Sequence, residues 1–283
     1  MATTVSLINM KGGVGKTTLS FNLAWYAAWK KNLRVLAVDL DPQSNLSQYF
    51  MGAMGYLNYL KKEGRTVVEV FEQFSPPAAA RKAPEPISPE DIVYPLQEWN
   101  DGSRLHLVPS RLELAWTLRN PTDKSDLLPR FLAKVKDQYD LIIIDCAPTE
   151  SILTTSAYIS SRYILVPVKP EYLATIGLPL LERSLREHKL RREDQTLDLA
   201  GIVFNDADPQ RVKREHNIAR NDVRENAAKY GWPVFENEAR HSDSYPTGAR
   251  TGKPIFLTKW ARYHVANEFN LVGDEFLNKV GLL

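Results

Sequence analysis

The sequence contains a single cysteine, Cys146, so no disulfide can form within the chain. Charge is nearly balanced, because 36 Lys and Arg stand against 34 Asp and Glu, and the formal net charge is only +2. No apolar run approaches the ~18 residues that cross a bilayer, and the first residues lack the basic and apolar regions of a secretory signal. These absences predict a cytoplasmic protein in which any basic binding surface is local.

Short apolar runs alternate with longer segments of helical pattern, such as residues 17–31. Runs of this kind, rich in Val, Ile and Leu and bounded by turns, are typical of buried parallel strands. We therefore expect one α/β domain over residues 1–283, with a mostly parallel central sheet and helices on both faces. The expected strands are 4–10, 33–40, 105–108, 140–145, 163–168 and 200–204.

Residues 75–90, SPPAAARKAPEPISPE, interrupt this alternation with five of the 18 prolines. Proline removes a backbone donor and fixes φ, so the stretch cannot be an interior helix or a central strand. We expect a Pro/Ala-rich surface insertion within the domain.

A glycine-rich stretch, NMKGGVGKTT at residues 9–18, joins the first expected strand to a helical segment. Glycines let backbone N–H groups converge on phosphate oxygens, and the following helix turns its N-terminus to the anion. Lys16 is placed to bind the β- and γ-phosphates, Thr17 to ligate Mg²⁺, and Thr18 to cap the helix or touch the α-phosphate. The expected nucleotide-binding residues here are Lys11, Gly12, Gly13, Val14, Gly15, Lys16, Thr17 and Thr18.

Two residues depart from the common phosphate loop: Met10 replaces its first glycine, and Lys11 adds a second lysine. The stretch matches the deviant motif K-G-G-x-G-K-[ST], and the chain resembles the ParA/MinD family of P-loop ATPases. The resemblance implies a P-loop NTPase fold in which Lys11 reaches across a homodimer to ATP held by the other subunit, much as an arginine finger does. The alternative is a lysine that faces solvent at the edge of the loop.

Two further stretches resemble the acidic motifs of this family. Residues 35–45, VLAVDLDPQSN, are similar to its D-x-D-P-Q motif, which implies that Asp41 orients the attacking water and Asp39 supports the Mg²⁺ shell. A helix-capping role for Asp41 before a proline is compatible with this. Residues 139–151, YDLIIIDCAPTES, resemble a Walker B strand, so Asp145 is expected to hold Mg²⁺, partly through water. Cys146 is expected to be a small packed residue.

The resemblance extends to the last third of the chain, where Asn205 matches the position that reads adenine in MinD-like relatives. Residues 262–283 place Val265, Phe269, Val272, Phe276 and Val280 at helical spacing, with acidic residues on the other side. An acidic face disfavours anionic lipid, so we expect this helix to pack on the core and predict no membrane contact. The nitrogenase iron protein branch is excluded because it needs two cysteines per subunit.

Local basic charge in the last third favours sequence-independent DNA contact, although each cluster alone is more often a solvated helix face. A helix is expected over 210–226 with Val212, His216, Ala219 and Val223 in its buried stripe and its basic residues off that stripe. The candidate DNA-binding residues are Lys213, Arg214, Arg220, Arg224, Arg240, Arg250, Lys259 and Arg262.

The resemblance therefore implies an ATP-dependent DNA partition or positioning ATPase that uses ATP and Mg²⁺. Its ATP-bound homodimer would bind DNA on the nucleoid, and a ParB-like partner would stimulate slow intrinsic hydrolysis. Two alternatives stay open: a membrane-associated, Min-like spatial regulator, and a metabolic ATP-dependent ligase or synthase on the same scaffold.

Overall fold

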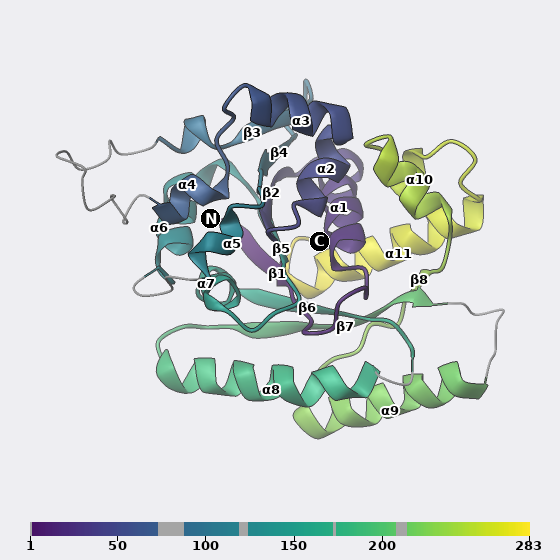
Figure 1. Ribbon diagram of the computed structural model, residues 1–283. Helices are drawn as coiled ribbons and strands as arrows, with labels where there is room; N and C mark the ends of the chain where they lie inside the picture. The colour runs from purple at the N-terminus through teal and green to yellow at the C-terminus, as the bar shows by residue number, and fades with distance from the viewer. Residues whose placement is uncertain (1, 73–87, 119–123, 172–173, 208–213) are drawn as a thin grey trace.

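The computed structural model describes residues 2–72, 88–118, 124–171, 174–207 and 214–283. Within them one sheet runs in the order β3-β4-β2-β5-β1-β6-β7-β8 (Figure 1). Every neighbouring pair is parallel except β3 and β4, which confirms the expected P-loop NTPase fold with a mostly parallel sheet. The strands are β1 (Thr3–Leu7), β2 (Arg34–Leu40), β3 (Tyr94–Glu98), β4 (Arg104–Val108), β5 (Leu141–Cys146), β6 (Tyr163–Val168), β7 (Asp198–Ala207) and β8 (Ala239–Arg240).

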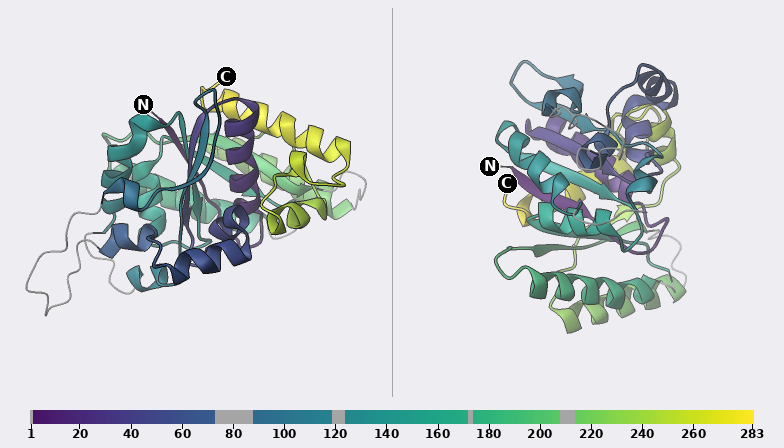
Figure 2. Two further views of the ribbon diagram at one scale, coloured as in Figure 1. Left: turned by 90° about the horizontal axis from the view of Figure 1, so that it is seen from above. Right: turned by 60° about the vertical axis from the view of Figure 1, so that its left-hand side comes forward.

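Helices cover both faces of this sheet, as Figures 1 and 2 show. Alternate residues of a strand face opposite sides, so Leu36 and Val38 pack under α4–α9 while Val35 and Ala37 pack under α1, α2 and α11. The helices are α1 (Lys16–Trp25), α2 (Asn45–Met51), α3 (Ala53–Lys61), α4 (Val67–Glu72), α5 (Leu114–Thr117), α6 (Leu127–Val135), α7 (Ile152–Ser160), α8 (Ala174–Arg191), α9 (Arg214–Tyr230), α10 (Ser244–Arg250) and α11 (Tyr263–Lys279).

The C-terminal helix α11 packs on the core, as the sequence predicted. All five residues of its expected apolar stripe are buried. Its acidic side chains bond to the protein as well: Glu268 pairs with Arg240, and Asp274 accepts a hydrogen bond from the Tyr26 hydroxyl at 2.7 Å. Among the described residues, no helix combines the length and apolar character needed to cross a bilayer.

Two sequence predictions fall partly outside the described residues. The expected insertion at 75–90 lies there except for its last residues, 88–90. The expected helix at 210–226 is observed as α9, four residues longer at its C-terminal end, and Ala219 and Val223 are buried as predicted. Arg220 differs from the prediction that it lies off the buried stripe: its side chain is turned inward and only 9% of the residue is exposed.

Candidate functional site

The glycine-rich loop connects β1 to α1 at the edge of the sheet where the parallel strands end. Gly13 and Gly15 have φ values of 72° and 84°, in the left-handed region that glycine adopts readily. Gly15 is the N-cap of α1, and no side chain caps that helix end. The first N–H groups of α1 therefore remain available to an anion.

Lys16 turns inward and lies almost completely buried. Its Nζ donates to the main-chain oxygens of Asn9 at 3.0 Å and Lys11 at 3.2 Å. Burial lowers the pKa of this ammonium, and the nearby Asp145 carboxylate opposes the shift. Within the described part of the chain, Lys16 forms no ion pair, so its charge fits a phosphate group held in the loop.

Asp145, at the end of β5, receives hydrogen bonds from two hydroxyls of α1. Thr17 Oγ1 donates to Oδ2 at 2.7 Å, and Ser20 Oγ donates to Oδ1 at 2.9 Å. Burial raises the pKa of this fully buried carboxyl to about 6. The sequence predicted that Thr17 and Asp145 share a site but missed Ser20, which its i,i+3 spacing from Thr17 could have revealed. A hydroxyl beside a carboxylate is a donor set that suits Mg²⁺.

Asp39, on the neighbouring strand β2, is paired in register with Asp145 and is also fully buried. Its Oδ2 accepts from Ser47 N at 2.8 Å and Ser47 Oγ at 2.6 Å, and its Oδ1 accepts from Asp41 N at 3.2 Å. Burial, then the Asp145 charge, raises the pKa of Asp39 to about 8. Ser47, which the sequence interpretation missed, thus ties the segment after β2 to the end of that strand.

Asp41 lies two residues further on, at the start of the segment that leads to α2. Its Oδ1 accepts a hydrogen bond from Gln43 N at 2.9 Å, and its main-chain oxygen accepts one from Ser110 Oγ at 2.9 Å. The carboxylate therefore caps a turn. The helix-capping role expected from the sequence is not observed, because the N-cap of α2 is Ser44 and no side chain caps that helix. Asp41 Oδ2 has no hydrogen-bond donor among the described residues.

Lys11 precedes the glycines of the loop, and its side chain is 28% exposed. Its Nζ pairs with Glu171 at 3.1 Å, and Glu171 also pairs with Lys169 at 2.8 Å. Lys169 continues to Asp206 at 2.7 Å, and Asp206 contacts His241. The two lysines of the loop thus have different surroundings: Lys16 contacts main-chain oxygens inside it, and Lys11 joins a chain of half-exposed ion pairs outside it.

Asn205, from β7, packs directly against the loop. Its Nδ2 donates to the main-chain oxygen of Val14 at 2.9 Å. A Cβ on Gly15 would lie only 2.0 Å from that nitrogen, so a larger residue would displace the Asn205 amide from Val14 and would also have to adopt a φ of 84°. Val14 itself is buried, and a Cβ on Gly12 would lie 4.0 Å from the Pro148 ring, an ordinary contact distance.

The candidate DNA-binding residues fall into two groups. Arg220 pairs with Glu238 at 2.8 Å and Arg240 with Glu268 at 2.7 Å, and both side chains are mostly covered. Arg224 reaches Glu238 at 3.8 Å with half of its side chain exposed. The exposed residues Arg250, Lys259 and Arg262 form no ion pair with any described residue. Lys213 and the side chain of Arg214 lie outside the described residues.

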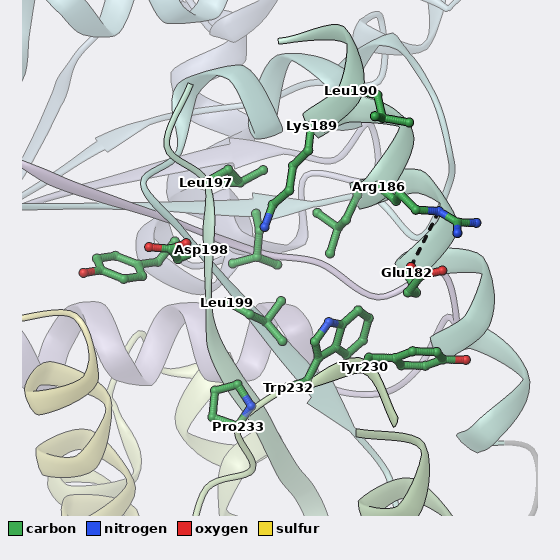
Figure 3. Close-up of a pocket in the computed structure, with 14 residues that line it drawn as sticks. Glu182, Arg186, Lys189, Leu190, Leu197, Asp198, Leu199, Tyr230, Trp232 and Pro233 are labelled. Carbon is green, nitrogen blue, oxygen red and sulfur yellow. Dashed lines mark ion pairs between the residues drawn. The ribbon is translucent and has the colours of Figure 1, made fainter. Parts of the chain in front are cut away.

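A cavity of about 720 Å³, bounded by described residues, lies far from the phosphate loop (Figure 3). It is formed by α8, the end of α9 and the first residues of β6 and β7, which is the opposite end of these strands. Figure 3 shows Lys189 extending from α8 toward the strand side, with Tyr230 and Trp232 on the other wall. This groove is separate from the candidate nucleotide site.

The loop joins a parallel strand to a helix whose N-terminus no side chain caps, and carboxyls lie at the ends of two adjacent strands. These features define a P-loop nucleotide-binding protein. The family model described as an AAA domain matches residues 2–198. The chain belongs to this family and is a ParA-type P-loop ATPase.

One relative agrees with this assignment, and two solved structures share the fold. The chain is 28% identical over 258 residues to the chromosome-partitioning ATPase Soj of Treponema pallidum, covering 90% of this chain and 89% of that protein. A variant of Cyanothece McdA in complex with ATP superposes with a TM-score of 0.77 at 19% identity, covering 100% of this chain and 97% of that one. Cobyrinic acid a,c-diamide synthase of Mycobacterium smegmatis, with a bound ATP analogue and magnesium, gives 0.71 at 22% identity, covering 97% and 93%.

Proposed function

We propose that this chain is an ATP-dependent DNA partition or positioning ATPase that works as a nucleotide-gated homodimer. One observation carries the proposal: the two lysines of the loop have separate surroundings. Lys16 is buried and reaches inward, whereas Lys11 is held at the surface by Glu171. A loop that only held a nucleotide would need no second lysine on its outer side.

Within one subunit, Lys16 would bind the β- and γ-phosphates of ATP, and the N–H groups of the loop and of α1 would bind the remaining phosphate oxygens. Thr17 and Asp145 would hold Mg²⁺, which neutralises phosphate charge when bound. Asp41 would orient the attacking water, because its Oδ2 has no donor among the described residues. Asp39 would support this arrangement by fixing the segment that carries Asp41 through Ser47.

Between subunits, Lys11 would leave Glu171 and bind the triphosphate of the facing copy. That exchange makes the nucleotide part of the dimer interface and supplies positive charge where the phosphoryl group transfers. Asn205 has its Nδ2 engaged with Val14, so its Oδ1 would accept from the adenine amino group.

The dimer would bind DNA without sequence preference, associate with the nucleoid and release DNA after a ParB-like partner stimulates hydrolysis. Slow turnover of the protein alone is expected, because a switch of this kind must wait for its partner. The likeness in sequence to a chromosome-partitioning ATPase supports this proposal.

DNA pelleting with ATP, ADP or no nucleotide, across a salt series, tests the proposal. Binding should require ATP and weaken steeply with salt, because Lys and Arg release counterions from DNA. A Lys11→Ala variant should still bind ATP but remain a monomer and lose DNA binding. Lys62→Ala, which removes an exposed lysine after α3, is the matched control. Binding of duplex DNA that ignores nucleotide, or a Lys11→Ala variant that dimerises normally, would overturn the proposal.

A second candidate is an ATP-dependent synthase, favoured by the likeness of the fold to cobyrinic acid a,c-diamide synthase. Such an enzyme would consume ATP in proportion to a carboxylated small-molecule acceptor. Stoichiometric turnover of an acceptor without any effect of DNA would select this candidate.

Flotation with liposomes tests a membrane-associated, Min-like role. The packing and ion pairing of α11 disfavour that role.

A further inference from the structure

The turn between α10 and α11 concentrates basic charge that the described protein does not neutralise. Residues 244–267 contain four cations and no Asp or Glu. Unlike Arg220 and Arg240, none of the four forms an ion pair with a described residue. Figure 1 shows this turn projecting from the right-hand side of the molecule. The cations are Arg250, Lys253, Lys259 and Arg262, and all four are exposed.

Two aromatic side chains lie among these cations. Trp260 is 87% exposed and Tyr263 is 84% exposed, the highest values of any large apolar residue in the described chain. The Lys259 ammonium lies 5.4 Å from the centre of the Trp260 ring. Single exposed apolar residues are ordinary on a protein surface. Here two exposed aromatic rings alternate with two cations that have no ion-pair partner among the described residues, in the sequence Lys-Trp-Ala-Arg-Tyr. This combination indicates a binding surface.

The backbone holds these rings outward in a fixed frame. Trp260 has φ of 68°, in the left-handed region, which costs a non-glycine residue about 1–2 kcal/mol. Thr258 Oγ1 donates to the main-chain oxygen of Pro254 at 2.8 Å, and Ala261 N donates to Thr258 O at 3.1 Å. Ile255 N donates to Asn22 Oδ1 at 2.7 Å, which ties the turn to α1. Backbone strain of this kind collects at functional sites.

We propose that this basic–aromatic turn (Arg250, Lys253, Lys259, Trp260, Arg262 and Tyr263) binds single-stranded nucleic acid. The cations would contact phosphates, and the two rings would stack on unpaired bases, the combination that single-strand-binding surfaces use. A duplex hides the faces of its bases, so stacking favours the single strand. The inference goes beyond the proposed partition function, because every residue of the turn comes from one copy of the chain and no nucleotide is needed.

A membrane surface also uses Trp, Tyr, Lys and Arg, but the surroundings of this turn disfavour it. Trp260 borders a hollow of about 290 Å³ that is lined mainly by polar side chains, including His241, Asp243 and His264. Insertion of Trp260 among the acyl chains would bring Asp243 and these histidines close to the bilayer. Removing their polar groups from water would cost free energy. Nucleic acid keeps the same groups in water.

Fluorescence anisotropy of labelled oligo(dT) of 20 nucleotides, with the full chain and no nucleotide at low salt, tests the inference. Trp260→Ala and Tyr263→Ala should each weaken binding roughly 5- to 150-fold, the range that stacking of one base supports. Trp116→Ala, which removes a Trp that is 60% exposed on α5, is the matched control and should have no effect. Oligo(dT) should quench the tryptophan fluorescence of the wild type but quench Trp260→Phe much less.

Salt provides a second readout. The double variant Lys259→Gln, Arg262→Gln should lower the slope of log K against log salt by about 1.4, because each phosphate contact on a single strand contributes about 0.7. Thermal unfolding of each variant checks that it folds.

Unchanged oligo(dT) binding by the Trp260→Ala, Tyr263→Ala double variant would overturn the inference. So would absence of oligo(dT) binding together with vesicle binding, from 30% anionic lipid, that needs Trp260. The two proposals can fail separately. If oligo(dT) binding needs Trp260 but the protein does not bind duplex DNA with ATP, this inference is supported and the partition proposal is contradicted.

Discussion

Charged side chains occupy two contrasting regions of this molecule. At the strand ends, Lys16, Asp39 and Asp145 are buried, and each contacts defined protein groups. At the turn between α10 and α11, Lys259 and Arg262 are exposed and unpaired among the described residues. Burial shifts pKa values and fixes geometry, so the first region suits chemistry on a small ligand. Exposure leaves charge available over a wide surface, but salt screens it.

The largest expected effect lies in the buried region. Lys16→Ala removes the ammonium that reaches into the loop and should weaken ATP binding at least about 100-fold, consistent with loss of charge-assisted phosphate contacts. Titration with a fluorescent ATP analogue measures it. Lys259→Ala, from the exposed region, should bind the analogue as the wild type does. Equal affinity of both variants would remove the contrast between the two regions.

Asp41→Ala should lower ATP hydrolysis by about 100-fold, a loss in the range of general-base and water-orienting groups, and leave nucleotide binding intact. The variant should accumulate as a dimer with ATP, because the proposed dimer would no longer be dismantled by hydrolysis. Phosphate release and light scattering after size-exclusion chromatography measure the two effects. A variant that stays monomeric with ATP contradicts the role assigned to Asp41.

Two arginines test the same contrast between covered and exposed charge through stability: Arg220 on α9, which has an ion-pair partner, and Arg250 on the exposed turn. Arg220→Ala should cost about 1.5–3 kcal/mol of unfolding free energy, because Glu238 loses a bidentate, largely buried partner. Arg250→Ala, on the exposed turn, should change it by less than about 0.5 kcal/mol. Urea unfolding followed by circular dichroism measures both. A large loss in Arg250→Ala would show that the turn is structural.

The last expected effect is on the pH dependence of stability. Asp39 and Asp145 have pKa values of about 8 and about 6, raised mainly by burial, whereas an unfolded Asp titrates near 4. The folded protein thus binds these protons more tightly, so the stability they contribute is lost as pH rises from about 4 toward about 8. Without Mg²⁺, the Tm of the wild type should fall between pH 5.5 and 8.5 more steeply than the Tm of Asp39→Asn. Each kcal/mol of unfolding free energy lost should lower the Tm by about 2–4 °C. Parallel curves would contradict the shifted pKa of Asp39.

The sequence predicted elements whose determinants are local. The buried strand β6 was predicted at its observed bounds, 163–168, because an apolar run between turns defines a parallel strand. The first strand was predicted to reach residue 10 but ends at Leu7. Ile8 and Met10 are apolar enough to continue it, but the Asn9 side chain between them donates to Pro167 O at 2.7 Å and accepts from Lys11 N. The edge strand β3 was not predicted, because its residues are mostly exposed and carry no apolar run.

The sequence could not predict pairings between distant segments. Arg220 carries the same charge as Arg250 in a sequence, and only the fold places Glu238 beside the first and no described acidic group beside the second. Glu171 is 160 residues from Lys11 along the chain. Ser47 was missed because its bond to Asp39 depends on how the segment after β2 turns back. Motif residues were found because their spacing is local, and their supporting groups were missed because theirs is not.

The ion pair between Lys11 and Glu171 also sets a threshold for assembly. A partly exposed ion pair of this kind is worth about 0.2–1 kcal/mol. It therefore favours the paired state of Lys11 over the unpaired state by up to about fivefold. In the proposed dimer, an incoming anion has to out-compete a single carboxylate. A triphosphate brings more negative charge to that competition than a diphosphate does. Discrimination between ATP and ADP would therefore arise as two subunits meet, because the nucleotide of the facing copy must displace Glu171 from Lys11.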